Sequence, residues 1–448
     1  MLPIARIPLS LNDFAEQFSE VFNHPAQMEH FKECLVGLIV ADNRTIAGIH
    51  QRLIDGEEYD ALRKFFSRSP WSASELQEIR LKWIKDKLPQ ERQSPTVVAI
   101  DPTFIHHTGE KIYGTYWYWD YAKRRYVVAQ RLVLSSWVSP TKQVPLSARL
   151  YHRGYLEEQQ LYLEEVKPSP DAPEEEWENY DDLVAAYDEN VAGHVKQWQL
   201  ACELVDQTEE LGIYKDAYVL DAALLVPDLA AKIETHGAAW VSRLAKNRLV
   251  EIGGRGSHQS LLTFAKSLPK DAFKLINVKT RHGKPRKYWC FSKCLKVKDW
   301  NKLRVVISYD NEELEGEPIF LVTNKSNWTQ PEKIVQLYMY RDPIEHFIRD
   351  EKQELGLENS QQRGQQAVEK YWELAFTAHS FLELGFHVIP PKEMTNATLE
   401  TTGQKCRLME REVLQDFVER VREWFLENWD TKELIDQIML RRLNRLAC

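Results

Sequence analysis

Apolar residues recur at helical spacing through about the first 92 residues, and strand-like runs take over after that. The stretch "SASELQEIRLKWIKDKL" begins with Ser72 and has Glu75 three places later, the pattern of a capping box at a helix start. From Thr96 the chain turns to apolar, β-branched and aromatic runs, the first of which ends on Asp101. These runs predict an antiparallel meander to about residue 137, and "VPLSARLYH" predicts one more strand.

The next part of the chain alternates helices and strands. We expect a helix over about 183–211, a strand ending on Asp221, a helix closed by Gly237 and a strand in "AAWVSRLAKN". With the meander, this order predicts a mixed α/β sheet. Short strands return between about 247 and 328 before long helices resume at "PEKIVQLYMYRDPIEHFIRD", so we interpret this stretch as an all-β insertion.

These changes of pattern divide the chain into five parts. We expect a helical DNA-binding domain over 1–92, although an ordinary helical bundle explains its short helices as well. The mixed-sheet core would comprise 93–246 and 329–385, with the insertion domain 247–328 between them and a helical region over 386–448. The amphipathic helices of that last region fit either a dimer contact or packing against the core.

Charge is distributed unevenly along the chain. The net charge is -9, but residues Tyr155–Asp182 hold eleven acids and one lysine, which indicates an exposed insertion. Residues 241–304, by contrast, hold seventeen Lys and Arg against three Asp and Glu. Such a basic block indicates either a surface that contacts a polyanion or a solvated sheet face.

Cysteine usage and hydropathy favour a protein of the cytoplasm. The six cysteines are scattered, as expected for reduced thiols. Cys290, Cys294 and His282 are the one group with metal-ligand character, but no second pair completes a tetrahedral set, which favours spare thiols. No apolar run approaches the ~20 residues of a membrane span, and the first residues lack the pattern of a secretion signal.

Two acids follow predicted strands, and a third lies on a later helix. Asp101 closes "TVVAID", Asp221 closes "AYVLD", and Glu345 follows "YMYRDPI". Carboxylates that converge can hold two Mg²⁺ ions for phosphodiester cleavage. An acid at a strand end is also an ordinary cap or turn residue, so position alone does not decide between the two interpretations.

Glu345 has a structural explanation of its own. Asp342 and Pro343 predict a helix start with Glu345 at its third position, where glutamate is stabilising, and Arg349 lies four residues further on as a favourable partner. Lys352 is about 20° from Glu345 around the helix, so the two would share one edge. The predicted buried stripe beside that edge is Ile344, Phe347, Ile348 and Leu355.

Tyr338, Arg341, Glu345 and Lys352 are separated by two, three and six residues. This spacing resembles the Y-(2)-R-(3)-E-(6)-K signature of a group of bacterial insertion-sequence DDE transposases. The stretch "IDPTF", with "KIYG" downstream, is similar to the first-Asp region of that family, and "VLDAALLVPDLAAKIETHGAAWVSRLAKN" is similar to its second-Asp region. The resemblance covers roughly residues 10–385 and includes a β-rich insertion at the same place.

Some positions depart from the family pattern. Pro102 stands where the family often has a second acid, and Asp342 stands where tryptophan is usual. Ala222 and Ala223 replace an aromatic residue and a glycine, and the acidic segment is unusual for the family. None of these changes removes an acid of the triad, and together they leave open a divergent or domesticated protein.

The resemblance implies an RNase H-like core in which Asp101, Asp221 and Glu345 bind two catalytic Mg²⁺ ions, with Mn²⁺ as a substitute. It implies a transposase that cuts at the transposon ends through a hairpin and joins them to target DNA, as a homodimer on paired ends, in a bacterial cytoplasm next to the nucleoid. The implied or predicted DNA contacts are Tyr338, Arg341, Lys352, Arg243, Lys246, Arg248, Arg286 and Lys287.

Hairpin formation needs a base out of the stack, and an aromatic of the insertion would receive it. Trp289 and Trp300 are the candidates, although a sheet tryptophan is more often part of the core. Two other functions stay open. One is a catalytically silent DNA-binding protein derived from a transposase, and the other is a stand-alone metal-dependent nuclease.

Overall fold

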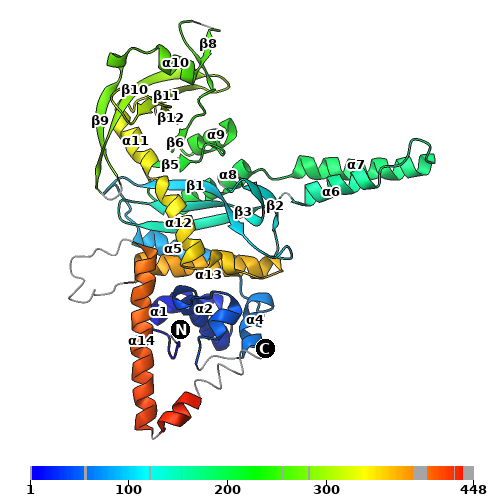
Figure 1. Ribbon diagram of the computed structural model, residues 1–448, viewed down its shortest axis with the longest axis vertical. Helices are drawn as coiled ribbons and strands as arrows, with labels where there is room; N and C mark the ends of the chain where they lie inside the picture. The colour runs from blue at the N-terminus through cyan, green and yellow to red at the C-terminus, as the bar shows by residue number, and fades with distance from the viewer. Residues whose placement is uncertain are drawn as a thin grey trace.

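A twelve-stranded mixed sheet forms the centre of the molecule, with helices packed against it (Figure 1). The computed structural model describes residues 3–54, 58–120, 123–152, 154–254, 256–280, 283–386, 401–427 and 429–436. The strand order is β2-β3-β1-β5-β6-β12-β11-β10-β7-β8, and β4 and β9 pair with β3 and β10. The mixed α/β class is therefore as the sequence predicts. The first six strands are β1 (Val97–His106), β2 (Tyr116–Asp120), β3 (Arg125–Val138), β4 (Gln143–Tyr151), β5 (Ala217–Leu220) and β6 (Trp240–Arg243).

The two faces of the sheet carry two separate apolar cores, because side chains alternate along each strand. Val97 and Ala99 of β1 face one core, and Val98 and Ile100 face the other. The first core also contains side chains from α2, α11, α12 and α13, and the second contains side chains from α5, α8, α9 and α10. The bounds of these helices are α2 (Pro25–Val40), α5 (Ala73–Lys87), α8 (Gln197–Glu210), α9 (Pro227–Thr235), α10 (Leu261–Ser267), α11 (Pro331–Met339), α12 (Asp342–Gln353) and α13 (Gln365–Ser380).

Helices make up both ends of the described chain, as predicted. The hydroxyl of Ser72 accepts a hydrogen bond from the backbone N–H of Glu75 and so caps α5, as the sequence indicates. Side chains of the N-terminal helices join the same apolar core as α13 and the sheet. The remaining elements are α1 (Leu9–Ala15), η1 (Glu16–Val21), α3 (Ile46–His50), α4 (Tyr59–Ser67), η3 (Leu357–Asn359), η4 (Phe381–Gly385) and α14 (Thr402–Leu426).

Residues 247–328 are rich in strands but are not all β. The helix α10 lies among them, capped by the hydroxyl of Ser260, and the short turn η2 (Lys270–Ala272) follows it. The strands also continue the central sheet, because β12 pairs antiparallel with β6. The strands of this stretch are β7 (Leu249–Glu251), β8 (His258–Ser260), β9 (Lys274–Lys279), β10 (Pro285–Val297), β11 (Lys302–Tyr309) and β12 (Ile319–Thr323).

The acidic segment forms two helices, α6 (Gly154–Glu165) and α7 (Glu174–Gly193), which project from the body as a hairpin (Figure 1). The three prolines of the segment lie in the turn between them. The single helix expected over 183–211 is wrong, since α7 ends at Gly193 and α8 begins at Gln197. Within the described part of the chain, no helix is both long and apolar enough to span a membrane. Most of the second predicted C-terminal helix lies outside the described residues.

Candidate active site

The register of two parallel strands brings Asp101 and Asp221 together. β1 and β5 pair with Val97 opposite Ala217 and Ile100 opposite Leu220, so the next residues of both strands are neighbours. The backbone N–H of Asp221 continues the pairing by donating to the carbonyl of Ile100, 3.2 Å away. Both acids follow residues that face the second core and therefore point to the face covered by α12.

The helix α12 carries Glu345 along that face. Its apolar stripe is buried as the sequence predicts, with side chains of Ile344, Phe347, Ile348 and, past its end, Leu355. The helix begins one residue earlier than expected, because Arg341 occupies the N-cap position and Asp342 already belongs to the first turn. The expected pairing of Arg349 with Glu345 is also wrong. The guanidinium of Arg349 contacts His346 at 2.8 Å and Asp350 at 3.7 Å.

One arginine joins the three acids. The Nη2 atom of Arg341 donates to Asp101 Oδ2 at 2.7 Å and to Asp221 Oδ2 at 2.6 Å, and Nη1 donates to Glu345 Oε1 at 3.3 Å. The Arg341 side chain is 14% exposed and that of Glu345 is 66% exposed, so the group opens to solvent on the helix side. The two aspartates and the glutamate thus converge on one positive charge, although they are far apart in the sequence.

The group contains three carboxyl groups and one guanidinium, so one positive charge cannot neutralise all three acids when they are ionised. The pKa of Asp101 is raised to about 7, chiefly by burial; the charges of Asp221 and Glu345 add to the rise, and Arg341 opposes it. The charges of Asp101 and Asp221 outweigh burial and raise the pKa of Arg341. A single guanidinium therefore faces three carboxyl groups, and an additional cation would stabilise their ionised forms.

A divalent metal ion fits the chemistry of these side chains. Carboxylate oxygens are hard ligands of the kind that Mg²⁺ takes, and the acids lack positive charge. Among the described residues, however, no group of three or more His, Cys, Asp or Glu side chains is arranged to hold a metal ion as it stands. The guanidinium of Arg341 lies among the three acids instead.

Tyr338 and Lys352, the outer residues of the signature, flank this group. Tyr338 lies on α11 near Arg341 and Arg243, and its pKa is raised to about 12 by burial against the opposing effect of these two cations. The Nζ atom of Lys352 donates to the carbonyl of Phe104 in β1 and lies 3.4 Å from Glu358 Oε1. Burial lowers the pKa of Lys352. The break between α11 and α12 falls next to Arg341, as expected from Pro343.

Glu358 is a residue of this region that the sequence did not indicate. Its Oε1 accepts from the backbone N–H of His106 at 3.0 Å and lies 3.0 Å from the Nδ1 atom of the same histidine. The other ring nitrogen of His106 lies 3.2 Å from Asp120 Oδ2. Burial alone would raise the pKa of Glu358, but the hydrogen bonds from His106 and the charge of Lys352 lower it to about 2. Lys352 of α12 thus belongs to an ion-pair network with Glu358 of η3 and His106 at the end of β1.

The other predicted DNA contacts are spread over the basic strands and loops. Arg243 is exposed at the end of β6, and Arg286 and Lys287 are exposed on β10. Arg248 is exposed before β7, and Lys246 pairs with Glu317.

The two tryptophans considered for base flipping, Trp289 and Trp300, both pack partly against the second core, and Trp300 contacts the ring of Trp240. The thiols of Cys290 and Cys294 are free and contact Ser308 and Ser326. The third member of that predicted group, His282, lies outside the described residues.

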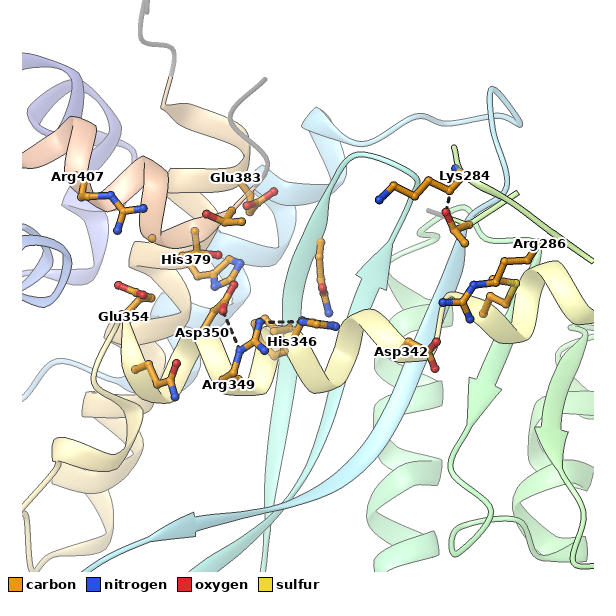
Figure 2. Close-up of a pocket in the computed structure, with 18 of the residues that line it drawn as sticks. Lys284, Arg286, Asp342, His346, Arg349, Asp350, Glu354, His379, Glu383 and Arg407 are labelled. Carbon is orange, nitrogen blue, oxygen red and sulfur yellow. Dashed lines mark hydrogen bonds and ion pairs between the residues drawn. The ribbon is translucent and has the colours of Figure 1, made fainter. Parts of the chain in front are cut away.

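A cavity of about 1050 Å³ lies along the other side of α12 (Figure 2). Asp342, His346 and Arg349 face it from the helix, and Lys284 and Arg286 face it from β10 and the turn before it. Its lining has both acidic and basic groups, and none of the three acids of the triad is among the described residues that line it. The cavity therefore lies beside the three acids and does not contain them.

Comparison with models of known protein families shows which family the chain belongs to. The model of the family described as DDE superfamily endonuclease matches residues 17–260, more than half of the chain. The chain belongs to this family. The model of the transposase DDE domain matches residues 182–381, so the two matches together include all three converging acids. A comparison with curated proteins gives no match.

Membership in the DDE superfamily makes the protein a nuclease-type enzyme with a transposase domain. Such families act on DNA and generally use divalent metal ions. In this structure Asp101 lies within β1, Asp221 directly follows the neighbouring parallel strand β5, and Glu345 is on α12. The sequence predicted this family from the spacing of four residues and from two acids that each follow an apolar run.

Proposed function

We propose that this DDE protein is an active transposase of the group with the Y-(2)-R-(3)-E-(6)-K signature. The observation that carries the proposal is the convergence of Asp101, Asp221 and Glu345 on one guanidinium. Three carboxylates gathered at one point repel each other, and a fold that serves only to bind DNA has no need to maintain them.

In this proposal the three acids hold two Mg²⁺ ions, for which Mn²⁺ substitutes. When bound, such ions activate an attacking oxygen and stabilise the leaving oxygen of a phosphodiester. Arg341, Lys352 and Tyr338 bind the phosphates next to the scissile bond, the guanidinium as a planar fork and the ammonium as a point charge. Arg243, which is exposed near Tyr338, and Arg286, which is exposed near Asp342, extend the contact along the duplex.

The chain's own residues then position the DNA for two successive reactions. In the first, water attacks the phosphorus at the transposon end, the bond from phosphorus to the 3′-oxygen breaks, and a 3′-hydroxyl is released. In the second, this hydroxyl attacks the opposite strand, which closes a hairpin on the transposon end and frees the flanking DNA. Opening of the hairpin by water restores the 3′-hydroxyl for transfer to target DNA, and pairing of two ends requires a dimer.

A plasmid assay tests this function. The DNA that flanks the gene would be placed on a supercoiled plasmid and incubated with Mg²⁺ and either wild-type protein or Glu345→Gln. We expect wild-type protein alone to cut at both flanks and to produce strands of double length on a denaturing gel, the product expected of a hairpin. Glu369→Gln, which changes an exposed acid on α13, is the matched control and should cut like the wild type.

Other results would assign a different function. If wild type and Glu345→Gln bind the flanks equally and neither cuts, the protein is a DNA-binding descendant of a transposase. If the wild type cuts a plasmid with a single flank as fast as one with two, the protein is a stand-alone nuclease.

A further inference from the structure

The guanidinium of Arg341 lies where a shared cation would lie. Its Nη2 atom is 2.7 Å from Asp101 Oδ2 and 2.6 Å from Asp221 Oδ2, so one nitrogen fills the space between the two oxygens. A Mg²⁺ ion needs distances of about 2.0–2.1 Å to such oxygens and a nearly octahedral arrangement of ligands around it. An ion that bridges this pair of oxygens and the guanidinium therefore exclude each other.

The Arg341 side chain lacks some of the hydrogen bonds expected of a guanidinium with a purely structural role. Its Nε atom is buried and has no hydrogen-bond partner among the described residues. A buried donor without a hydrogen-bond partner is destabilising, and the contact with Glu345 is long at 3.3 Å. Charge, more than a full set of hydrogen bonds, holds the side chain in place. A phosphate group offers a guanidinium two parallel hydrogen bonds and is a natural competitor for it.

The position of Arg341 in the chain gives it room to change partners. The residue lies between the end of α11 at Met339 and the start of α12 at Asp342, so its backbone belongs to a helix junction and not to the middle of a helix. Lys352, the other signature cation, is also engaged by the chain itself, through the carbonyl of Phe104 and the carboxylate of Glu358. In the free protein both cations that are meant for DNA thus have internal partners.

We propose that Arg341 makes metal binding conditional on DNA. In the free protein its guanidinium neutralises the triad and takes the place of a divalent ion between Asp101 and Asp221. When DNA arrives, a backbone phosphate binds the guanidinium and draws it away from the aspartates, which opens the position between them. The inference rests on the proposed function, since it takes the three acids as the metal ligands.

Two consequences follow from this exchange. Free protein would bind divalent ions weakly, which protects the cell from a metal-activated nuclease that has not found its DNA. By thermodynamic linkage, DNA and metal would raise each other's affinity by the same factor.

Binding of Mn²⁺ to the DNA-free protein, followed by electron paramagnetic resonance of the free ion, tests the proposal without measuring cleavage. We expect Arg341→Gln to bind Mn²⁺ at least 10-fold more tightly than wild type, and Arg341→Lys, which keeps a cation there, to stay within 3-fold of wild type. Arg349→Gln, which removes a cation of the same helix that contacts His346 and Asp350, is the control, and its Mn²⁺ affinity should not change. Asp101→Asn should weaken Mn²⁺ binding in the Arg341→Gln background.

The reciprocal measurement uses fluorescence anisotropy of a labelled flank duplex with and without Ca²⁺, with a titration of the duplex alone as a blank. Ca²⁺ should strengthen DNA binding by wild type several-fold and should have less effect on Arg341→Gln. Equal Mn²⁺ affinities of wild type and Arg341→Gln would overturn the role of Arg341 while leaving the enzyme intact. If Asp101→Asn has no effect on Mn²⁺ in either background, the acids are not the metal ligands and the proposed function fails as well.

Discussion

Glu358 is a single carboxylate that contacts both His106 and Lys352 beside the candidate site. It accepts a backbone and a side-chain contact from His106 and lies 3.4 Å from the Nζ atom of Lys352. Its pKa is lowered from the ordinary 4.5 to about 2, so its ionised form stabilises the folded state. That stability is fully present above the unfolded-state pKa of 4.5 and is lost as pH falls toward 2.

We therefore expect Glu358→Gln to lower the free energy of unfolding at pH 7 by about 1–2 kcal/mol, less than the full linkage value because the side chain is 31% exposed. Urea unfolding of both proteins between pH 7 and pH 3 measures this effect. The difference should be constant down to about pH 5 and shrink below that. A difference that persists unchanged at pH 3 would contradict the assignment. The control is Glu369→Gln, whose exposed carboxylate contacts only Gln365 among the interactions described.

At the scale of residues, the sequence was informative where chemistry depends on local position. Asp101 and Asp221 were found because each ends an apolar run, and Glu345 because it belongs to a spaced signature. The contacts of Arg341 with the aspartates and of Glu358 with His106 span 120 to 252 residues, and no local pattern reports such distances. The identities of candidate residues were therefore predictable, whereas their internal partners were not.

At the scale of elements, one buried arginine links the helix that carries it, α5, to α13 and β4. Arg80 of α5 is fully buried; it pairs with Glu373 of α13 and donates at 2.8 Å to the carbonyls of Pro145 and Leu146 in β4. Removing one partner of a buried ion pair leaves an uncompensated charge, which costs about 3–5 kcal/mol. We expect Arg80→Met to destabilise the protein by that amount in urea unfolding.

A double variant separates the charge from the packing. Arg80→Met combined with Glu373→Met should recover most of the loss, because an apolar pair can replace a buried ion pair at little net cost. Additive losses in the double variant would show that the carbonyl contacts of Arg80, and not its pairing with Glu373, stabilise the junction. Arg63→Met is the exposed control; its pairing with Asp60 at 3.2 Å should contribute less than about 0.5 kcal/mol.

Element prediction succeeded where a helical pattern was long and uninterrupted and failed where the pattern was short or contained a helix-ending residue. The capped helix α5 and the buried stripe of α12 are as the sequence predicts. The strands expected from Thr96 to about residue 137 form, but the expected meander is wrong: β1 continues past Asp101 to His106 and pairs with β3 instead of β2. The seven residues of α10 are too few to establish a helical period, so the basic stretch was taken as all β. The expected helix over 183–211 overlooked Gly193, the kind of residue that ends helices, and the structure breaks there.

At the scale of the whole molecule, the acidic hairpin combines a large negative charge with an exposed position. Between Gln159 and Asn190, whose side chains are 3.1 Å apart, the chain holds eleven acids and one lysine. None of the described residues of α7 is buried, and the two helices project from the body (Figure 1). Replacing residues 160–189 with a short Gly-Ser linker should therefore change the melting temperature by less than about 2 °C, because little apolar burial is lost.

The same deletion changes the net charge of the chain from -9 to +1. The effect of this change on DNA binding depends on the distance between the hairpin and the DNA. Charges act over about 8 Å at 0.15 M salt and about 30 Å at 0.01 M. For a hairpin that projects away from the basic strands, we expect duplex affinity to change less than 2-fold at 0.15 M and to rise several-fold at 0.01 M. Glu174, Glu175 and Glu176 changed to glutamine should give a smaller change in the same direction. A gain of more than 10-fold at 0.15 M would instead mean that the hairpin reaches the DNA-binding surface and competes with DNA for it.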